Sequence, residues 1–192
     1  MIAAAGGCDF AGIYAPQVIE NAQNVLVLPG AGAPGIDGPG AGRAESGLLI
    51  TSLADLQYFK SVEGPVRMRK ALAGRQDALW DGAVQAEVSK TLGIDLLALC
   101  EVTDYRFTKE FHKSNYVVGS GYATETEHIV AVSVRFISPA DGRLVFCGSG
   151  LGKSKEGFGP AMVSATEMAL KELKAFLDQM KQKHKQTLAK GS

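Results

Sequence analysis

One stretch in the second half of the chain limits the possible folds more than any other. Between residues 127 and 138, apolar and more polar residues alternate: Ile129, Ala131, Ser133 and Arg135 against Val130, Val132, Val134 and Phe136. A period of two is typical of a β-strand with one covered face. Residues 139–142 (Pro-Ala-Asp-Gly) then predict a turn, and residues 143–150 predict the partner strand. The chain therefore has to contain an antiparallel β-hairpin.

Shorter signals predict the remaining elements. Apolar runs at 24–29 and 96–102, the second extended to residue 107, predict buried strands, and residues 59–63 predict a short one. Helical spacing of apolar residues predicts helices at 43–58, 65–73, 80–92 and 161–190. Taken in order, these elements predict an α/β (α+β) fold. We expect a mixed β-sheet with helices packed on it, a closing β-hairpin and a long C-terminal helix.

Length and charge set the broad class. A chain of 192 residues suits one domain, and 46% hydrophobic residues are enough for a core. Twenty basic residues balance twenty acidic ones, so no nucleic-acid partner is expected. We expect a flexible N-terminal tail or lipoprotein linker over 1–23, the α/β domain over 24–180 and a basic helix end over 181–192.

The three cysteines, Cys8, Cys100 and Cys147, lack the spacing of a zinc site. Cys100 and Cys147 lie in apolar runs and are expected to be small buried residues, although neighbouring strands would allow them to pair in an oxidising compartment. Small residues before Cys8 resemble the end of a bacterial lipoprotein signal. Cys8 is therefore either a lipid-anchored residue or an incidental cysteine in a disordered tail.

Two glycine-rich segments suggest phosphate binding, but neither is complete. Residues 30–35 match G-x-G-x-x-G, yet prolines and further glycines delay the next helix to about Arg43. Residues 148–154 resemble the end of a P-loop, but the first required glycine falls on Cys147. We interpret both as glycine-rich connections, with a nucleotide-binding enzyme as the less favoured alternative.

Catalytic and metal motifs are also missing from the sequence. It contains neither the G-x-S-x-G elbow of hydrolases nor the H-E-x-x-H zinc motif. No catalytic, cofactor-binding or metal-binding residue is nominated, and no cofactor is expected.

Several blocks of the chain together resemble the CsgG-like superfamily of curli-secretion lipoproteins, with the TolB N-terminal domain as a wider relative. Their order carries the resemblance: a first strand ending in proline, a helix followed by a strand after Phe59, a Leu-Gly-Ile-Asp block entering the next strand, an Asp-Gly hairpin and a final helix. They span residues 25–29, 48–62, 92–105, 132–146 and 161 onward.

The resemblance implies a non-enzymatic lipoprotein of the periplasm or outer membrane of a Gram-negative bacterium. Such a protein acts in assembly or secretion, through self-association or a protein partner. Activation of a peptidoglycan synthase on the same fold is the alternative.

The candidate interaction surface is an aromatic-rich segment between the two long strands. Aromatic residues mixed with charges suit a protein interface. The competing interpretation is a longer hairpin whose aromatic side chains cover the domain's own core. The candidate residues are Tyr105, Phe107, Phe111, Tyr116 and Tyr122.

Overall fold

The computed structural model describes residues 11–32, 40–72, 81–116 and 119–190, and its architecture is the expected mixed α/β one. A seven-stranded sheet has the order β1-β7-β6-β5-β2-β4, and β3 pairs with β5. Its strands are β1 (Gly12–Ile13), β2 (Asn24–Val27), β3 (Ala31–Gly32), β4 (Ser61–Glu63), β5 (Leu96–Tyr116), β6 (Gly119–Ile137) and β7 (Leu144–Ser154). Its helices are α1 (Pro16–Asn21), α2 (Ala41–Asp55), α3 (Pro65–Ala71), α4 (Gly82–Leu92), α5 (Phe158–Ala169) and α6 (Lys171–Lys190).

The sheet has a parallel half and an antiparallel half. Strands β4, β2 and the beginning of β5 run parallel, whereas β5, β6 and β7 form an antiparallel meander. The predicted closing hairpin is confirmed. Gly142 has a φ of +68° at its turn, and the Ser138 N–H donates to the Arg143 carbonyl oxygen at 2.9 Å. Left-handed backbone favours glycine, so the Asp-Gly pair determines where the chain reverses.

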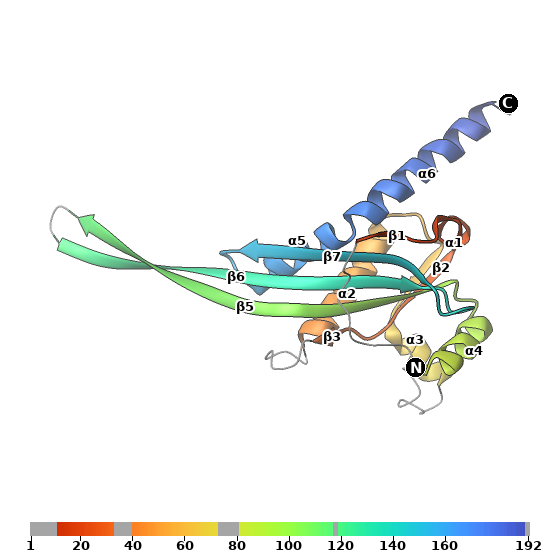
Figure 1. The fold of residues 1–192 in the computed structure, drawn as a ribbon, viewed down its shortest axis with the longest axis horizontal. Helices are drawn as coiled ribbons and strands as arrows, with labels where there is room; N and C mark the ends of the chain where they lie inside the picture. Colours follow the sequence, from red (N-terminus) through yellow and green to blue (C-terminus); the bar gives the residue numbers. More distant parts are fainter. Residues whose placement is uncertain (1–10, 33–39, 73–80, 117–118, 191–192) are drawn as a thin grey trace.

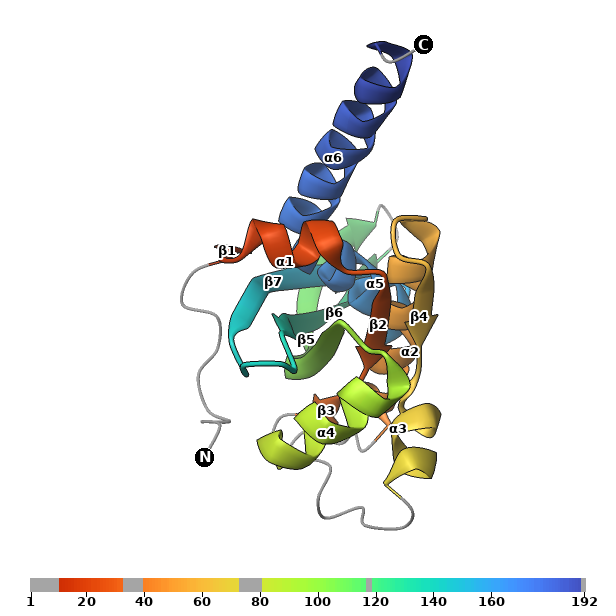
Figure 2. The same cartoon turned by 90° about the vertical axis from the view of Figure 1, so that its right-hand side faces the viewer.

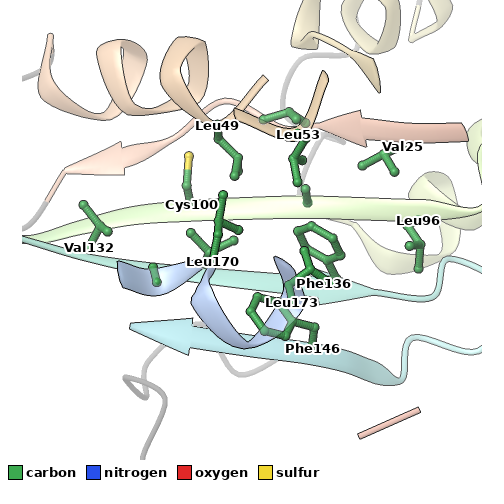
Figure 3. Packing of buried hydrophobic residues seen from close by; sticks show 14 of the residues in the cluster. Val25, Leu49, Leu53, Leu96, Cys100, Val132, Phe136, Phe146, Leu170 and Leu173 are labelled. Carbon is green, nitrogen blue, oxygen red and sulfur yellow. The ribbon is translucent and has the colours of Figure 1, made fainter. Parts of the chain in front are cut away.

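Two hydrophobic clusters lie on opposite faces of the sheet. The larger one is formed by α2, α5, the first turns of α6 and one face of the strands. Leu49 and Leu53 of α2 and Leu173 of α6 extend into this layer beside Phe136 and Phe146 (Figure 3). The smaller cluster joins α3 and α4 to Leu26, Leu28 and Leu97 (Figure 2 shows these helices beside the beginning of the sheet).

The N-terminal region differs from the expected flexible tail. Within the expected tail of 1–23, residues 12–13 form β1 against β7, and residues 16–21 form α1. Ala15 and Ile19 are buried in the main cluster. These two apolar contacts and the strand pairing order this part of the chain, and the short runs of apolar residues were too brief to predict it.

The last helix consists of two helices rather than one. Helix α5 ends at Ala169, and Leu170 still has helical backbone angles (φ −90°, ψ −1°), so the chain bends there without a long loop. Helix α5 lies on the sheet, while α6 leaves the domain and ends far from it (Figures 1 and 2). The predicted apolar stripe is largely confirmed, because Met162, Leu173 and Leu177 are buried.

The most prominent feature of the molecule is a long ribbon formed by β5 and β6. The two strands pair from Leu97 and Ile137 out to Tyr116 and Gly119. Strand β7 accompanies them only as far as the pairing of Ser154 with His128. Beyond that point the two-stranded ribbon projects out of the body of the domain (Figure 1). Hereafter "the ribbon" means residues 108–116 and 119–127.

Candidate interaction surface

The structure places Tyr105 at the base of the ribbon, against the domain itself. Its ring stacks on Phe158, at the beginning of α5, with centroids 3.9 Å apart and planes 13° from parallel. His128 meets the same Phe158 edge-on at 4.7 Å. Tyr105 is partly buried against the main core. For this residue, the interpretation that the aromatics cover the domain's own core is therefore the better one.

Phe107 is different, because it remains accessible. It is paired in register with His128, and its ring centroid lies 6.5 Å from that of the imidazole. The side chain is 54% exposed. The Lys109 ammonium lies 5.5 Å from the Phe107 ring centroid, a cation–π contact that a partner would further desolvate. An exposed aromatic ring beside a cation suits an interface better than a core.

The other three candidate residues lie in the ribbon. Phe111 and Tyr116 are on β5 and Tyr122 is on β6, and their strand partners are Thr124, Gly119 and Lys113 in that order. Their side chains are outside the described part of the molecule, so their role in an interface stays a prediction. Of the described candidate residues, Tyr105 thus packs against the body of the domain, whereas Phe107 faces solvent where the ribbon begins.

Ion pairs border the ribbon and its base. The distances are 3.1 Å for Arg106–Asp104 and 3.1 Å for Lys153–Glu127, and Lys155 contacts Glu125. The hydrogen bond and the charge of Glu125 raise the pKa of Lys155. Solvent screens exposed pairs of this kind, so they maintain solubility more than they stabilise the fold.

The glycines that suggested a P-loop belong to strand β7 and have a packing role. A Cβ on Gly148, Gly150 or Gly152 would lie 1.8–1.9 Å from a carbonyl oxygen of α5, at Ala169, Ala165 and Ala161 respectively. Only strand residues without side chains allow the helix backbone to come this close. Lys153 points to the other face and pairs with Glu127. The strand predicted at 143–150 therefore continues through Ser154, and the glycine-rich exit expected beyond residue 150 is wrong, since these residues are in the sheet.

The same reasoning applies to the first glycine segment. A Cβ on Gly30 would lie 2.1 Å from the Gly42 carbonyl oxygen, so the segment between β2 and β3 touches the beginning of α2 backbone to backbone. Gly30 also donates its N–H to the Ser46 hydroxyl at 2.6 Å. Residues 31–32 pair with β5, and residues 33–39 lie outside the described part. The described glycines here join a strand to a helix.

One acidic side chain is strongly perturbed, and it lies in the core. Glu45 of α2 is 0% exposed and its carboxyl oxygens accept hydrogen bonds from the Thr166 hydroxyl of α5 at 3.0 Å. Burial raises the Glu45 pKa to about 7, against a smaller opposite effect of the Thr166 hydrogen bond. A perturbed carboxyl often indicates catalysis, but that role requires contact with a substrate. Full burial between two helices makes Glu45 a structural link instead.

Two shallow hollows lie beside the β6–β7 turn. One, of about 420 Å³, is bordered by α1 and Asp95, and the other, of about 290 Å³, by the beginning of α4. The Asp95 carboxylate accepts the backbone N–H groups of Gln23 and Asn24 at 2.8 and 2.9 Å. These two hydrogen bonds hold the beginning of β2 beside the end of α4.

The two described cysteines, Cys100 and Cys147, differ in chemical state. Cys100 is a free thiol, buried as expected, and burial raises its pKa to about 12. Cys147 is also buried as expected, but it is disulfide-bonded and not a free thiol. It is not paired with Cys100, because β6 separates their two strands and Cys100 is free. Cys8 lies outside the described residues.

Sequence reasoning missed several residues that the structure brings together. Phe158, Leu151 and Met168 were not singled out, although Phe158 stacks on a candidate residue and the other two are exposed apolar side chains. A signal was present: glycines at every second position from 148 to 152 and alanines at every fourth from 161 to 169. Together these repeats indicate a close contact between a strand and a helix.

None of the described helices combines the length and the hydropathy that crossing a bilayer requires.

Comparisons with known proteins support the fold. No protein-family model matches the chain, and no curated protein matches it in sequence. Among solved structures, the dodecamer of a single-residue variant of PelC from Paraburkholderia phytofirmans is 15% identical, has a TM-score of 0.55, and the match covers 86% of this chain and 94% of that one. A second crystal form of the PelC dodecamer is also 15% identical, with a TM-score of 0.53. That match covers 84% of this chain and 91% of the PelC chain.

A further solved structure, lipoprotein GNA1162 from Neisseria meningitidis, is 15% identical with a TM-score of 0.45, covering 69% of this chain and 83% of that one. At these identities, the PelC structures, with TM-scores above 0.5, establish a shared architecture. The CsgG-like resemblance stays a prediction.

Proposed function

We propose that this chain is a non-enzymatic cell-envelope protein that works through protein–protein contact, chiefly by self-association, and that the ribbon and its base provide the contact surface. The observation that carries the proposal is the ribbon itself. Among the described residues, its two strands pair only with each other beyond Ser154. An isolated two-stranded ribbon is marginally stable in water, so a partner that covers it would stabilise it.

Two further observations support contact rather than catalysis. The strongly perturbed carboxyl, Glu45, is fully buried, and Lys153 of the P-loop-like segment is engaged by Glu127 on the surface of a strand. The exposed Phe107 ring at the base of the ribbon is the type of side chain that interfaces use. The alternative of a nucleotide-binding enzyme receives no support from the described glycines.

Both PelC structures are dodecamers, and this architecture is therefore compatible with self-association. We take self-association of the present chain as the first property to test. Activation of a peptidoglycan synthase stays a prediction that no described residue favours, and a pull-down with the synthase tests it.

The disulfide at Cys147 supports an envelope location, because disulfides persist in oxidising compartments such as the periplasm. Anchoring through a lipid on Cys8, in the outer membrane, stays a prediction. A lipid attached to a cysteine occupies its sulfur atom, so that cysteine cannot also form a disulfide. Mass spectrometry of non-reduced peptides from the membrane fraction therefore tests the anchor: acylated Cys8 supports it, and Cys8 linked to Cys147 refutes it.

The main experiment shortens the ribbon. Lys109 and Thr126 face each other in register, so residues 110–125 can be replaced by Asn-Gly, which favours a two-residue hairpin turn. We expect this variant to keep its circular dichroism spectrum and to lose self-association in light scattering. The control removes residues 182–192, of which 182–186 are exposed on α6, and leaves the ribbon intact.

If the shortened variant does not fold, the point variant Phe107→Ser replaces it, since that side chain is already half exposed. Unchanged oligomer size in a folded ribbon variant, or a wild-type chain that is monomeric at all concentrations, would refute the proposal.

A further inference from the structure

Among the described residues, the outer edge of β7 is open along most of its length. There, strand β1 pairs with it at Phe146 and Cys147. From Gly148 to Ser154, no described strand pairs with this edge, although β6 pairs with the other side throughout. The backbone N–H and C=O groups of every second residue in a strand point to the same edge, so this segment presents a row of groups ready to pair. Proteins usually protect such edges, and one left open is a template for another chain.

Exposed apolar side chains flank this open edge on both faces of the sheet. Leu151 is 46% exposed and lies on the face opposite α5, since the neighbouring Gly150 and Gly152 face the helix. Met168 of α5 is 52% exposed. Thr166 of α5 points toward α2, and successive helical residues are rotated by about 100°, so Met168 lies on the flank directed away from α2, above β7. A strand added to β7 would bury both side chains.

The same sheet offers a matching edge at its other side. Beyond β3, which pairs with Glu101 and Val102, the outer edge of β5 has no partner among the described strands from Asp104 to Glu110. Phe107 lies on this edge, on the face that also carries Tyr105 and α5. When the β5 edge of one molecule is placed beside the β7 edge of another, Phe107 and Met168 come to the same face of the extended sheet. The two exposed apolar groups then cover each other.

Direction and charge favour this pairing between two copies of the chain. Strands β5 and β7 are each antiparallel to β6 and thus run the same way, so identical copies in the same orientation can pair them in parallel. On the face opposite α5, the β7 edge carries Lys153 and the β5 edge carries Asp104 and Glu110. The docked lysine would lie between Glu127 of its own chain and the acidic residues of the next chain, a complementary arrangement.

Pairing of β7 with β7 of a second copy is sterically unfavourable. Helix α5 lies directly over β7, where its carbonyl oxygens approach the glycines. Neighbouring strands are about 5 Å apart, whereas packed helices require about 8–10 Å between their axes. If β7 paired with β7 of a second copy, the two α5 helices would therefore clash above the paired strands. Pairing of β7 with β5 avoids this clash.

We infer that the outer edge of β7, residues 148–154, receives the outer edge of β5, residues 104–110, from a second copy of the chain, in a repeating head-to-tail contact. This inference rests on the proposed self-association and adds, at the base of the ribbon, a second contact to the one that the ribbon itself forms.

The first test places charges on the apolar borders of the edge. Leu151→Lys and Met168→Lys alter exposed side chains, and Val66→Lys on α3, 60% exposed, is the matched control. We expect the dissociation constant from light scattering to rise at least about tenfold for the first two variants and to stay the same for the control. Unchanged association in both edge variants, with native circular dichroism, would overturn the inference.

The second test traps the contact between Ser149 on β7 and Arg106 on β5, whose side chains lie exposed on the same face. Under mild oxidation, the double variant Ser149→Cys/Arg106→Cys is expected to give a ladder of dimers, trimers and larger species on non-reducing gels. Each single variant is expected to give no ladder. Dimers from Ser149→Cys alone would indicate β7–β7 pairing and refute the head-to-tail contact.

A third measurement, the oligomer size after removal of residues 1–10, shows whether the chain's own N-terminal segment occupies the β7 edge. Removal of residues 1–10 is expected to leave the oligomer size unchanged. If removal converts a monomer into an oligomer, the chain's own N-terminal segment occupies the β7 edge and the inference fails. A wild-type chain that never self-associates refutes the proposed function together with the inference. An oligomer that is insensitive to every edge variant and gives no ladder refutes the inference alone.

Discussion

The buried carboxyl of Glu45 makes the stability of the domain depend on pH in a defined direction. Burial raises its pKa from 4.5 to about 7, so the folded state holds this proton more tightly than the unfolded chain does. Stability from this group is therefore complete below about pH 4.5 and is lost as the pH rises through about 7. At 1.36 kcal/mol for each tenfold change in proton affinity, the loss is about 3 kcal/mol.

Glu45→Gln tests this reasoning because the amide has nearly the same shape and never ionises. It can keep a hydrogen bond with the Thr166 hydroxyl. We expect the variant to be close to the wild type in stability at pH 4.5 and more stable by up to about 3 kcal/mol at pH 8. Urea unfolding at pH 4.5, 6 and 8, expressed as the difference between variant and wild type, measures the effect without contributions from other titrating groups.

A matched control is Glu167→Gln on α5, whose side chain is exposed. This control should show a difference from the wild type that does not change with pH. The reasoning is refuted if the free-energy difference between Glu45→Gln and the wild type is the same at pH 4.5 and pH 8.

Three further changes test the packing and the helix ends. Gly150→Ala places a Cβ 1.9 Å from the Ala165 carbonyl oxygen. We therefore expect the free energy of unfolding in urea to fall by about 1–3 kcal/mol. An unchanged free energy of unfolding would show that α5 is not packed tightly against β7. Gly47→Ala in the interior of α2 meets nothing within 4 Å, and we expect a gain of about 0.5–1 kcal/mol, contradicted by any decrease in the melting temperature. Asp81→Ala removes the side-chain cap that accepts the Ala83 N–H at 2.9 Å, and a cost of about 1 kcal/mol is expected in thermal unfolding, whereas Asp81→Asn should retain most of the stability.

Part of the candidate surface could be recognised from residue types alone. The aromatic cluster around Phe107 was visible, and that ring is exposed where the ribbon begins. The sequence could not separate Phe107 from Tyr105, because their difference depends on Phe158, which lies far away along the chain and stacks on Tyr105. The open edge of β7 was equally hidden, since the absence of a neighbouring strand among the described residues is a property of the assembled sheet.

Local patterns by themselves determined the elements of this protein. The period-two alternation at 127–138, the Asp-Gly turn and the helical spacing of apolar residues predicted the strands, the hairpin and most helices, because each depends on residues close together in the chain. Only the tertiary structure decided the strand order, the bend at Leu170 and the length of the ribbon. The strands of the ribbon pair only with each other among the described residues, so its length follows from strand pairing and not from a local pattern.

The same distinction explains Glu45 and the glycines of β7. A glutamate in an amphipathic helix and a Gly-Ser-Gly-Leu-Gly segment are each compatible with several environments. Their roles appeared when α5 came to lie on the sheet, which enclosed the carboxyl beside Thr166 and brought the helix backbone against the glycines. Burial and close packing arise between segments more than a hundred residues apart, or on opposite sides of a turn, and no local pattern encodes them.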